Sequence, residues 1–166
     1  MHRFVPVVAV SCLIAALPSM AENNPTITPD DLRPLVQSDW VGSLTYMNYQ
    51  PPYQDVTIPA ELEVSRQAEG LDLYFKYPDE PHANSRYTFT YSESDGTLDG
   101  NPIILRETTE DGTLKIITGY TCEDMGRAAD CTTTITLSNT EFTQTKHVTY
   151  SDTGEKIRRN AYSYSR

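Results

Sequence analysis

Apolar and polar residues alternate along most of the chain after residue 40. Between Val56 and Val64, for example, every second residue is apolar and most of the residues between them are polar. A period of two places the apolar side chains on one face of a β-strand. Pro, Gly, Asn and Asp interrupt the alternation about every ten residues, as turns do between antiparallel strands. The pattern therefore predicts short strands joined mostly by tight turns.

Nine strands are expected, with a short tenth strand near Thr97 as an alternative. The predicted strands are residues 40–49, 56–66, 71–77, 86–91, 103–108, 114–120, 132–137, 142–150 and 156–165. Because most connections are short, strands adjacent in sequence should pair, and no segment has the spacing of a βαβ crossover. Closing such a meander removes the unpaired edges of the sheet. The prediction is an all-β, up-and-down antiparallel β-barrel of about 8–10 strands, with a two-sheet sandwich as the alternative.

The first 21 residues have the pattern of a cleaved signal peptide. A short basic start precedes an apolar stretch from Phe4 to Leu17, and small residues stand at the expected cleavage positions before and at Ala21. The apolar stretch is too short for a membrane span, and an uncleaved N-terminal anchor is the alternative. The expected product is a single β-barrel domain, residues 22–166, that is periplasmic or secreted.

A short helix is expected before the first strand. Thr28 is a helix N-cap residue, and Pro29 is common at the first helical position. Leu32 and Leu35 follow at helical spacing. Pro34 limits the helix to about two turns, because proline has no amide hydrogen to donate.

Two cysteines, Cys122 and Cys131, remain after removal of residues 1–21. An even number in an oxidising compartment predicts one disulfide. Gly126 and polar residues lie between them, which places the bridge at the ends of a hairpin loop. A metal or redox site is disfavoured, because there is no Cys-x-x-Cys spacing and no further set of ligands.

Composition narrows the classes of function. The formal net charge of −10 repels phosphate backbones and anionic membrane surfaces, so a nucleic-acid partner is not expected. The chain has no Gly-x-Ser-x-Gly motif and no metal-ligand spacing, and we expect neither enzymatic activity nor a cofactor. An enzyme built from distant residues such as Glu107 and Tyr120 is an open alternative. The expected oligomeric state is a monomer or a weak oligomer.

Trp40-Val41-Gly42 opens the first predicted strand after the short helix, and the last strand carries Arg158, Arg159 and Arg166. Together with the meander, these features resemble the lipocalin and fatty-acid-binding-protein group of small barrels, the calycins. The order here is Trp-x-Gly, where lipocalins have Gly-x-Trp. In that group a Trp of the first strand packs across the closed end of the barrel against an Arg of the last strand. The resemblance implies that Trp40 is this residue and that Arg158 or Arg159 is its partner.

The inward faces of the predicted strands are apolar and carry several phenols, which suits a site for one small amphipathic molecule. The expected lining residues are Tyr46, Tyr77, Tyr91 and Tyr120. A cation, Arg106, Lys146 or Arg159, would anchor an acidic group of the ligand. The expected cavity has a volume of at least about 300 Å³. The alternative is an envelope interaction or inhibitor module with a filled core, acting through the loops 51–54, 78–84 and 122–131.

Overall fold

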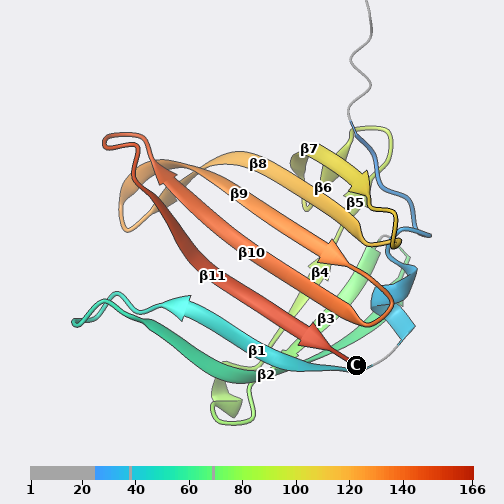
Figure 1. Cartoon of the computed structure of the whole chain (residues 1–166), viewed down its shortest axis with the longest axis horizontal. Helices are drawn as coiled ribbons and strands as arrows, with labels where there is room; N and C mark the ends of the chain where they lie inside the picture. The colour runs from blue at the N-terminus through green and yellow to red at the C-terminus, as the bar shows by residue number, and fades with distance from the viewer. Residues whose placement is uncertain (1–24, 38, 69) are drawn as a thin grey trace, which may run out of the picture.

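A computed structural model describes residues 25–37, 39–68 and 70–166, and the predicted signal peptide lies outside the described residues. Eleven antiparallel strands form one sheet that curls into a nearly closed barrel (Figure 1). This arrangement confirms the predicted up-and-down barrel and excludes the two-sheet sandwich. The nine expected strands become eleven because the strand expected at 86–91 is split at Thr90 into two and the alternative strand near Thr97 is present.

Strands adjacent in the chain pair with each other except β4 and β5, and the first strand also pairs with the last. The strands are β1 (Trp40–Met47), β2 (Asp55–Gln67), β3 (Gly70–Lys76), β4 (Ser85–Phe89), β5 (Tyr91–Ser92), β6 (Thr97–Leu98), β7 (Asn101–Thr108), β8 (Leu114–Asp124), β9 (Arg127–Leu137), β10 (Glu141–Tyr150) and β11 (Lys156–Ser165). Two 3₁₀ helices, η1 (Arg33–Gln37) and η2 (Pro81–Ala83), complete the described secondary structure. Neither helix is long enough to cross a membrane.

The two edge strands, β4 and β5, follow one another in the chain and meet at Thr90. The Thr90 amide donates to the Asp99 carboxylate at 2.9 Å, and the Asp99 amide donates to the Thr90 carbonyl at 2.7 Å. Gly70 at the start of β3 lies against the same seam, where a Cβ atom would be 2.2 Å from the Phe89 carbonyl oxygen. At this seam the Thr90–Asp99 bonds extend the β5–β6 pairing, and the close approach of the Phe89 carbonyl admits only glycine at position 70.

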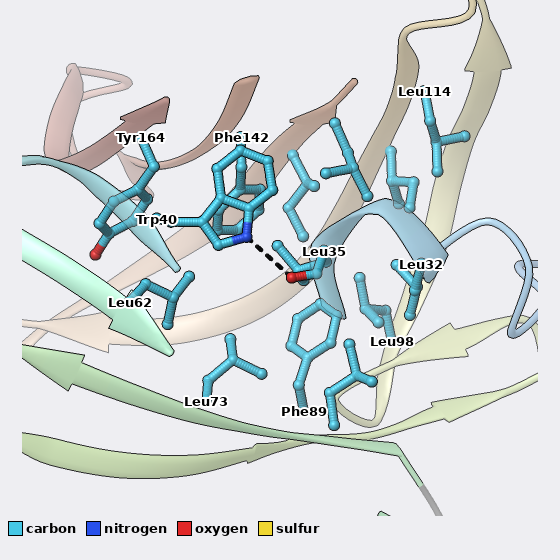
Figure 2. Close-up of a cluster of buried hydrophobic side chains, with 14 of the residues drawn as sticks. Leu32, Leu35, Trp40, Leu62, Leu73, Phe89, Leu98, Leu114, Phe142 and Tyr164 are labelled. Atoms are coloured by element: carbon cyan, nitrogen blue, oxygen red, sulfur yellow. Dashed lines mark hydrogen bonds between the residues drawn. The ribbon is translucent and has the colours of Figure 1, made fainter. Parts of the chain in front are cut away.

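The N-terminal segment fills one end of the barrel, which we call the closed end. Before η1 a turn forms in which the Asp31 carboxylate accepts the Thr28 amide at 2.8 Å. The Trp40 indole N–H donates to the Leu35 carbonyl oxygen at 2.9 Å, inside the core (Figure 2). The apolar side chains around this bond include Ile27, Leu32, Leu62, Leu73, Phe89, Leu98, Leu114, Phe142 and Tyr164. The hydrogen bond satisfies two polar groups that burial would otherwise leave unpaired.

The structure corrects the expected partner of Trp40. The guanidinium of Arg166, rather than that of Arg158 or Arg159, lies over the Trp40 ring, 4.8 Å from its centroid. Strands β1 and β11 are antiparallel, with Val41 paired to Ser165, so the start of β1 lies beside the end of β11. Arg158 is near the other end of β11, where it forms an ion pair with Asp55.

The Cys122–Cys131 disulfide is present, with 5.9 Å between the two Cα atoms, but its place differs from the prediction. It lies within the β8–β9 ladder, which continues beyond it to a pair between Asp124 and Arg127. The connection is a two-residue turn, Met125-Gly126, in which both residues have positive φ. This is the geometry that two-residue hairpins prefer, and it extends both strands past the cysteines.

Candidate ligand site in the barrel

The inward face of the wall formed by β8 to β11 changes from apolar to polar along the strands. Near the closed end, the paired residues form an apolar row of Leu114, Leu137, Phe142 and Tyr164. Four residues further along each strand, the paired residues form a polar row of Thr118, Thr133, Lys146 and Asn160. Side chains of a β-strand return to the same face every second residue, so both rows point into the barrel.

A cavity of about 180 Å³ lies against the polar row. Its apolar lining consists of Phe89, Leu98 and Ile135. Its other lining residues are Tyr87, Asp99, Asn101, Thr118, Tyr120, Thr133, Gln144, Lys146, Asn160 and Tyr162. The volume is below the expected 300 Å³, because the N-terminal segment and the aromatic residues of the closed end occupy part of the interior. A cavity of about 150 Å³ holds a benzene molecule, so this one suits a ligand with a single ring or a short chain.

Lys146 is the half-buried cation of this cavity. Its Nζ atom lies 5.8 Å from the centroid of the Tyr120 ring. No carboxylate of the described residues is within the 4.0 Å ion-pair distance of Lys146. Arg66 and Lys156 also lack an ion pair within that part of the chain, but both are exposed to solvent. Lys146 is therefore a cation that an anionic ligand could reach and pair with.

Asp99 is the acidic residue of the same cavity. Its carboxylate accepts the Thr90 amide and is hydrogen-bonded to the Tyr87 hydroxyl. Burial raises the pKa of Asp99, and these two hydrogen bonds oppose the increase. Burial and the nearby carboxylate raise the pKa of Tyr87 to about 12, so the phenol keeps its proton at neutral pH. A carboxylate has about four acceptor sites, and the two bonds leave capacity for a further donor.

The hairpins β1–β2, β8–β9 and β10–β11 all lie at the end of the barrel away from Trp40, which we call the mouth (Figure 1, left). One Asp124 oxygen accepts both the Tyr49 hydroxyl, at 2.5 Å, and the Tyr150 hydroxyl, at 2.7 Å. The other oxygen lies 3.3 Å from Nε of Arg159. The guanidinium of Arg159 also lies 4.3 Å from the centroid of the Tyr49 ring. We call these four residues the mouth clasp, because they join three separate hairpins.

The mouth clasp is built around an ionised carboxylate. Burial raises the pKa of Asp124, but hydrogen bonds from Tyr49 and Tyr150 and the charges of Arg159 and Lys146 outweigh it and leave the pKa below its ordinary value. Burial and the Asp124 carboxylate raise the pKa of Tyr49 well above its usual range. The clasp therefore consists of a carboxylate, two protonated phenols and a guanidinium at neutral pH. The contribution of Lys146 shows that the cavity and the clasp lie within electrostatic reach of each other.

A scan against protein-family models and a search of curated proteins both find no significant match to this chain. The fold is compatible with a calycin-like barrel, and the likeness extends to that architecture alone. Among the described residues, no three His, Cys, Asp or Glu side chains are grouped so that they could hold a metal ion.

The seven residues predicted to form a ligand site fall into three places. Tyr120 and Lys146 line the cavity. Tyr77 and Tyr46 lie next to it, since the Tyr77 hydroxyl is hydrogen-bonded to that of Tyr162 at 2.8 Å and Tyr46 pairs with the lining residue Asn160. The other three lie elsewhere.

Of those three, Tyr91 packs against the main core. Arg106 forms an ion pair with Asp31 at 2.6 Å, in the N-terminal segment, and Arg159 belongs to the mouth clasp. The lining residues that the sequence prediction missed include Asp99 and Asn160. Asn160 stands at an inward position of the last strand and could have been found by alternation, whereas Asp99 is in a turn, where Asp is ordinary.

Proposed function

We propose that this barrel binds one small amphipathic molecule in its interior cavity, with Lys146 as the anchor for an acidic group of the ligand. The observation that carries the proposal is the position of Lys146, half-buried against the cavity and without an ion-pair partner among the described residues. A cation removed from water is costly unless an anion or several hydrogen-bond acceptors compensate it. A ligand carboxylate would supply that compensation.

The rest of the lining supports a ligand with one polar and one apolar part. Gln144 and Asn160 lie beside Lys146 and have amide groups that can bond a carboxylate. Phe89 and Ile135 offer apolar surface to a ring or a short chain. A volume near that of a benzene site limits the ligand to roughly ten non-hydrogen atoms.

The test is a titration of ¹⁵N-labelled protein with benzoate and hexanoate, followed by amide chemical shifts. Binding in the cavity should move the resonances of Thr118, Thr133 and Asn160 in a saturable way. Lys146→Met keeps the apolar stem of the side chain and removes the charge, so it should weaken binding at least tenfold. Lys156→Met removes an exposed cation from β11 and should leave binding unchanged. Equal binding to the wild type and the Lys146 variant would contradict the proposal.

A second candidate is an interaction module that acts through the hairpin tips at the mouth. Tyr53 and Met125 support it, because their side chains are 64% and 60% exposed and both have positive φ, which is unfavourable for residues other than glycine. Exposed apolar side chains held on ordered tips suit contact with another protein. Failure of every carboxylate to shift the cavity resonances would favour this candidate.

We also propose that the protein is exported to the periplasm or the cell exterior. The Cys122–Cys131 disulfide supports this, since such bonds persist in oxidising compartments. The intact mass of protein expressed from the full-length chain should correspond to a polypeptide that begins at Glu22, less two protons for the disulfide. A mass that retains residues 1–21 would contradict cleavage.

A further inference from the structure

We infer that the ligand is a zwitterion, whose carboxylate pairs with Lys146 and whose ammonium group pairs with Asp99. The inference rests on the proposed function, because it assumes that the cavity binds a small molecule. It goes further by assigning a second charged contact and, with it, a chemical class. That class is an amino acid or an amino-acid-like compound with a short apolar part.

The cavity carries two opposite charges that do not pair with each other. Lys146 and Asp99 both line it, and their charged atoms are more than 4.0 Å apart, because no ion pair joins them. Asp99 has no Lys or Arg partner among the described residues either. A ligand with only a negative charge would pair with Lys146 but be repelled by Asp99. A ligand with only a positive charge would pair with Asp99 but be repelled by Lys146. A zwitterion compensates both charges at once.

Two tyrosine residues of the cavity lie beside these charges. Tyr87 is hydrogen-bonded to Asp99, Tyr120 lies under the Lys146 ammonium, and the two phenols are close enough to interact electrostatically. These residues form one wall of the cavity that runs from the carboxylate to the ammonium. The faces of tyrosine rings attract cations, so a ligand ammonium group near Asp99 would also be stabilised by this wall.

A purely structural role for Asp99 is the competing explanation, because its carboxylate holds the Thr90 amide at the barrel seam. Asp99→Asn separates the two roles. Asparagine keeps a carbonyl oxygen that can accept the Thr90 amide, and it removes only the negative charge. A seam function should survive this substitution, whereas recognition of an ammonium group should not.

The experiment uses straight-chain amino acids with one to six methylene groups between the ammonium and the carboxylate, so that the series scans the separation of the two charges. Carboxylates and amines of equal length are the matched probes, and ¹⁵N amide shifts of the full chain give the dissociation constants. We expect one or more of the zwitterions to bind at least tenfold more tightly than its carboxylate and its amine analogue. In Asp99→Asn this zwitterion should lose at least tenfold in affinity, while the carboxylate should bind as well as before or better.

Asp79→Asn is the matched control, because Asp79 is an exposed acid of the β3–β4 connection, and it should change nothing. If the carboxylates bind as tightly as the zwitterions, and Asp99→Asn changes the affinity of neither, the inference is overturned and the proposed function stays intact. The absence of any cavity shift with all three series at 10 mM probe concentration, on the order used for weak ligands, would overturn both.

Discussion

The two ends of the barrel are closed by different physical means. At the closed end the chain places its own N-terminal segment under Trp40, and most contacts there are apolar, beside the indole bond to Leu35 and the Arg106–Asp31 ion pair. At the mouth, a shared carboxylate, Asp124, holds three hairpins through phenols and a guanidinium. One meander thus closes one end by burial and the other end by charge-assisted hydrogen bonds.

The two ends of the barrel should also differ in how easily they open. Burial of many apolar side chains stabilises the closed end, and nothing in water replaces those contacts when they are lost. The hydrogen bonds of the mouth clasp exchange with bonds to water, so their net contribution is smaller. We therefore expect the mouth to open at lower free energy than the closed end, which makes it the entrance to the cavity in the proposed function.

The largest effect is expected at the closed end, from Trp40→Ala. The indole is fully buried, and truncation of a buried Trp costs about 3–5 kcal/mol through lost burial and the cavity left behind. Urea unfolding followed by far-UV circular dichroism measures this change. Val41→Ala, at an outward position that is 61% exposed, is the control and should change the free energy of unfolding by less than about 0.5 kcal/mol. A loss below about 1 kcal/mol for Trp40→Ala would contradict the expectation that the closed end opens at higher free energy than the mouth.

Removal of the disulfide should have the next largest effect. Replacing Cys122 and Cys131 by Ala releases a ring with a sequence separation of 9, which the loop-entropy model values at about 2–3 kcal/mol. Thermal unfolding of the oxidised wild type and the double variant measures the loss. Because the chain has one Trp, which lies at the closed end, the native fluorescence spectrum should stay the same. A spectrum that changes would mean that the disulfide region supports the closed end as well.

The barrel was predictable from sequence because alternation and turn residues are local signals. The alternating positions of β2 from Ile58 to Val64 face the core as expected, and the closure of β1 on β11 followed from the need to pair both edges. The partner of Trp40 was missed although the information was present. In an antiparallel pair the last residues of β11 lie beside the first residues of β1, which points to Arg166.

The candidate site was less predictable, since it depends on features that the sequence does not mark. A register shift between Lys146 and His147 leaves Arg159 outside the regular pairing of β11, so that it reaches Asp124 while the adjacent Asn160 lines the cavity. Such bulges have no reliable sequence signal. The inward position of Lys146 follows from alternation, but its lack of a partner depends on where every carboxylate lies in space.

At the mouth, Asp124→Asn should cost on the order of 2 kcal/mol at neutral pH, because Arg159 and two phenols lose a charged acceptor. Since the folded-state pKa of Asp124 is lowered, its stabilising effect is complete above the unfolded value and is lost as the pH falls through the folded value. The difference in melting temperature between wild type and variant should therefore be constant near neutral pH and shrink below pH 3.8.

Asp152→Asn is the control for this prediction, because Asp152 pairs with Arg127 at the same end of the barrel but is exposed. Exposed ion pairs contribute little, so its melting temperature should stay close to that of the wild type at neutral pH. Equal losses in both variants would show that the clasp is an ordinary surface contact and not the element that holds the mouth.

The smallest effect is expected from Arg166→Gln, and it tests whether the two ends are independent. The guanidinium lies over the Trp40 ring and its Nε atom donates to the Asn139 carbonyl, so its removal should cost less than about 1 kcal/mol. The fluorescence of Trp40 should nevertheless change, because the charge next to the indole is lost. Asp124→Asn should leave that fluorescence unaltered in spite of its larger effect on stability. If the mouth variant shifts the Trp40 spectrum as much as Arg166→Gln does, then strain passes along the strands from one end to the other, and the barrel closes as one cooperative unit.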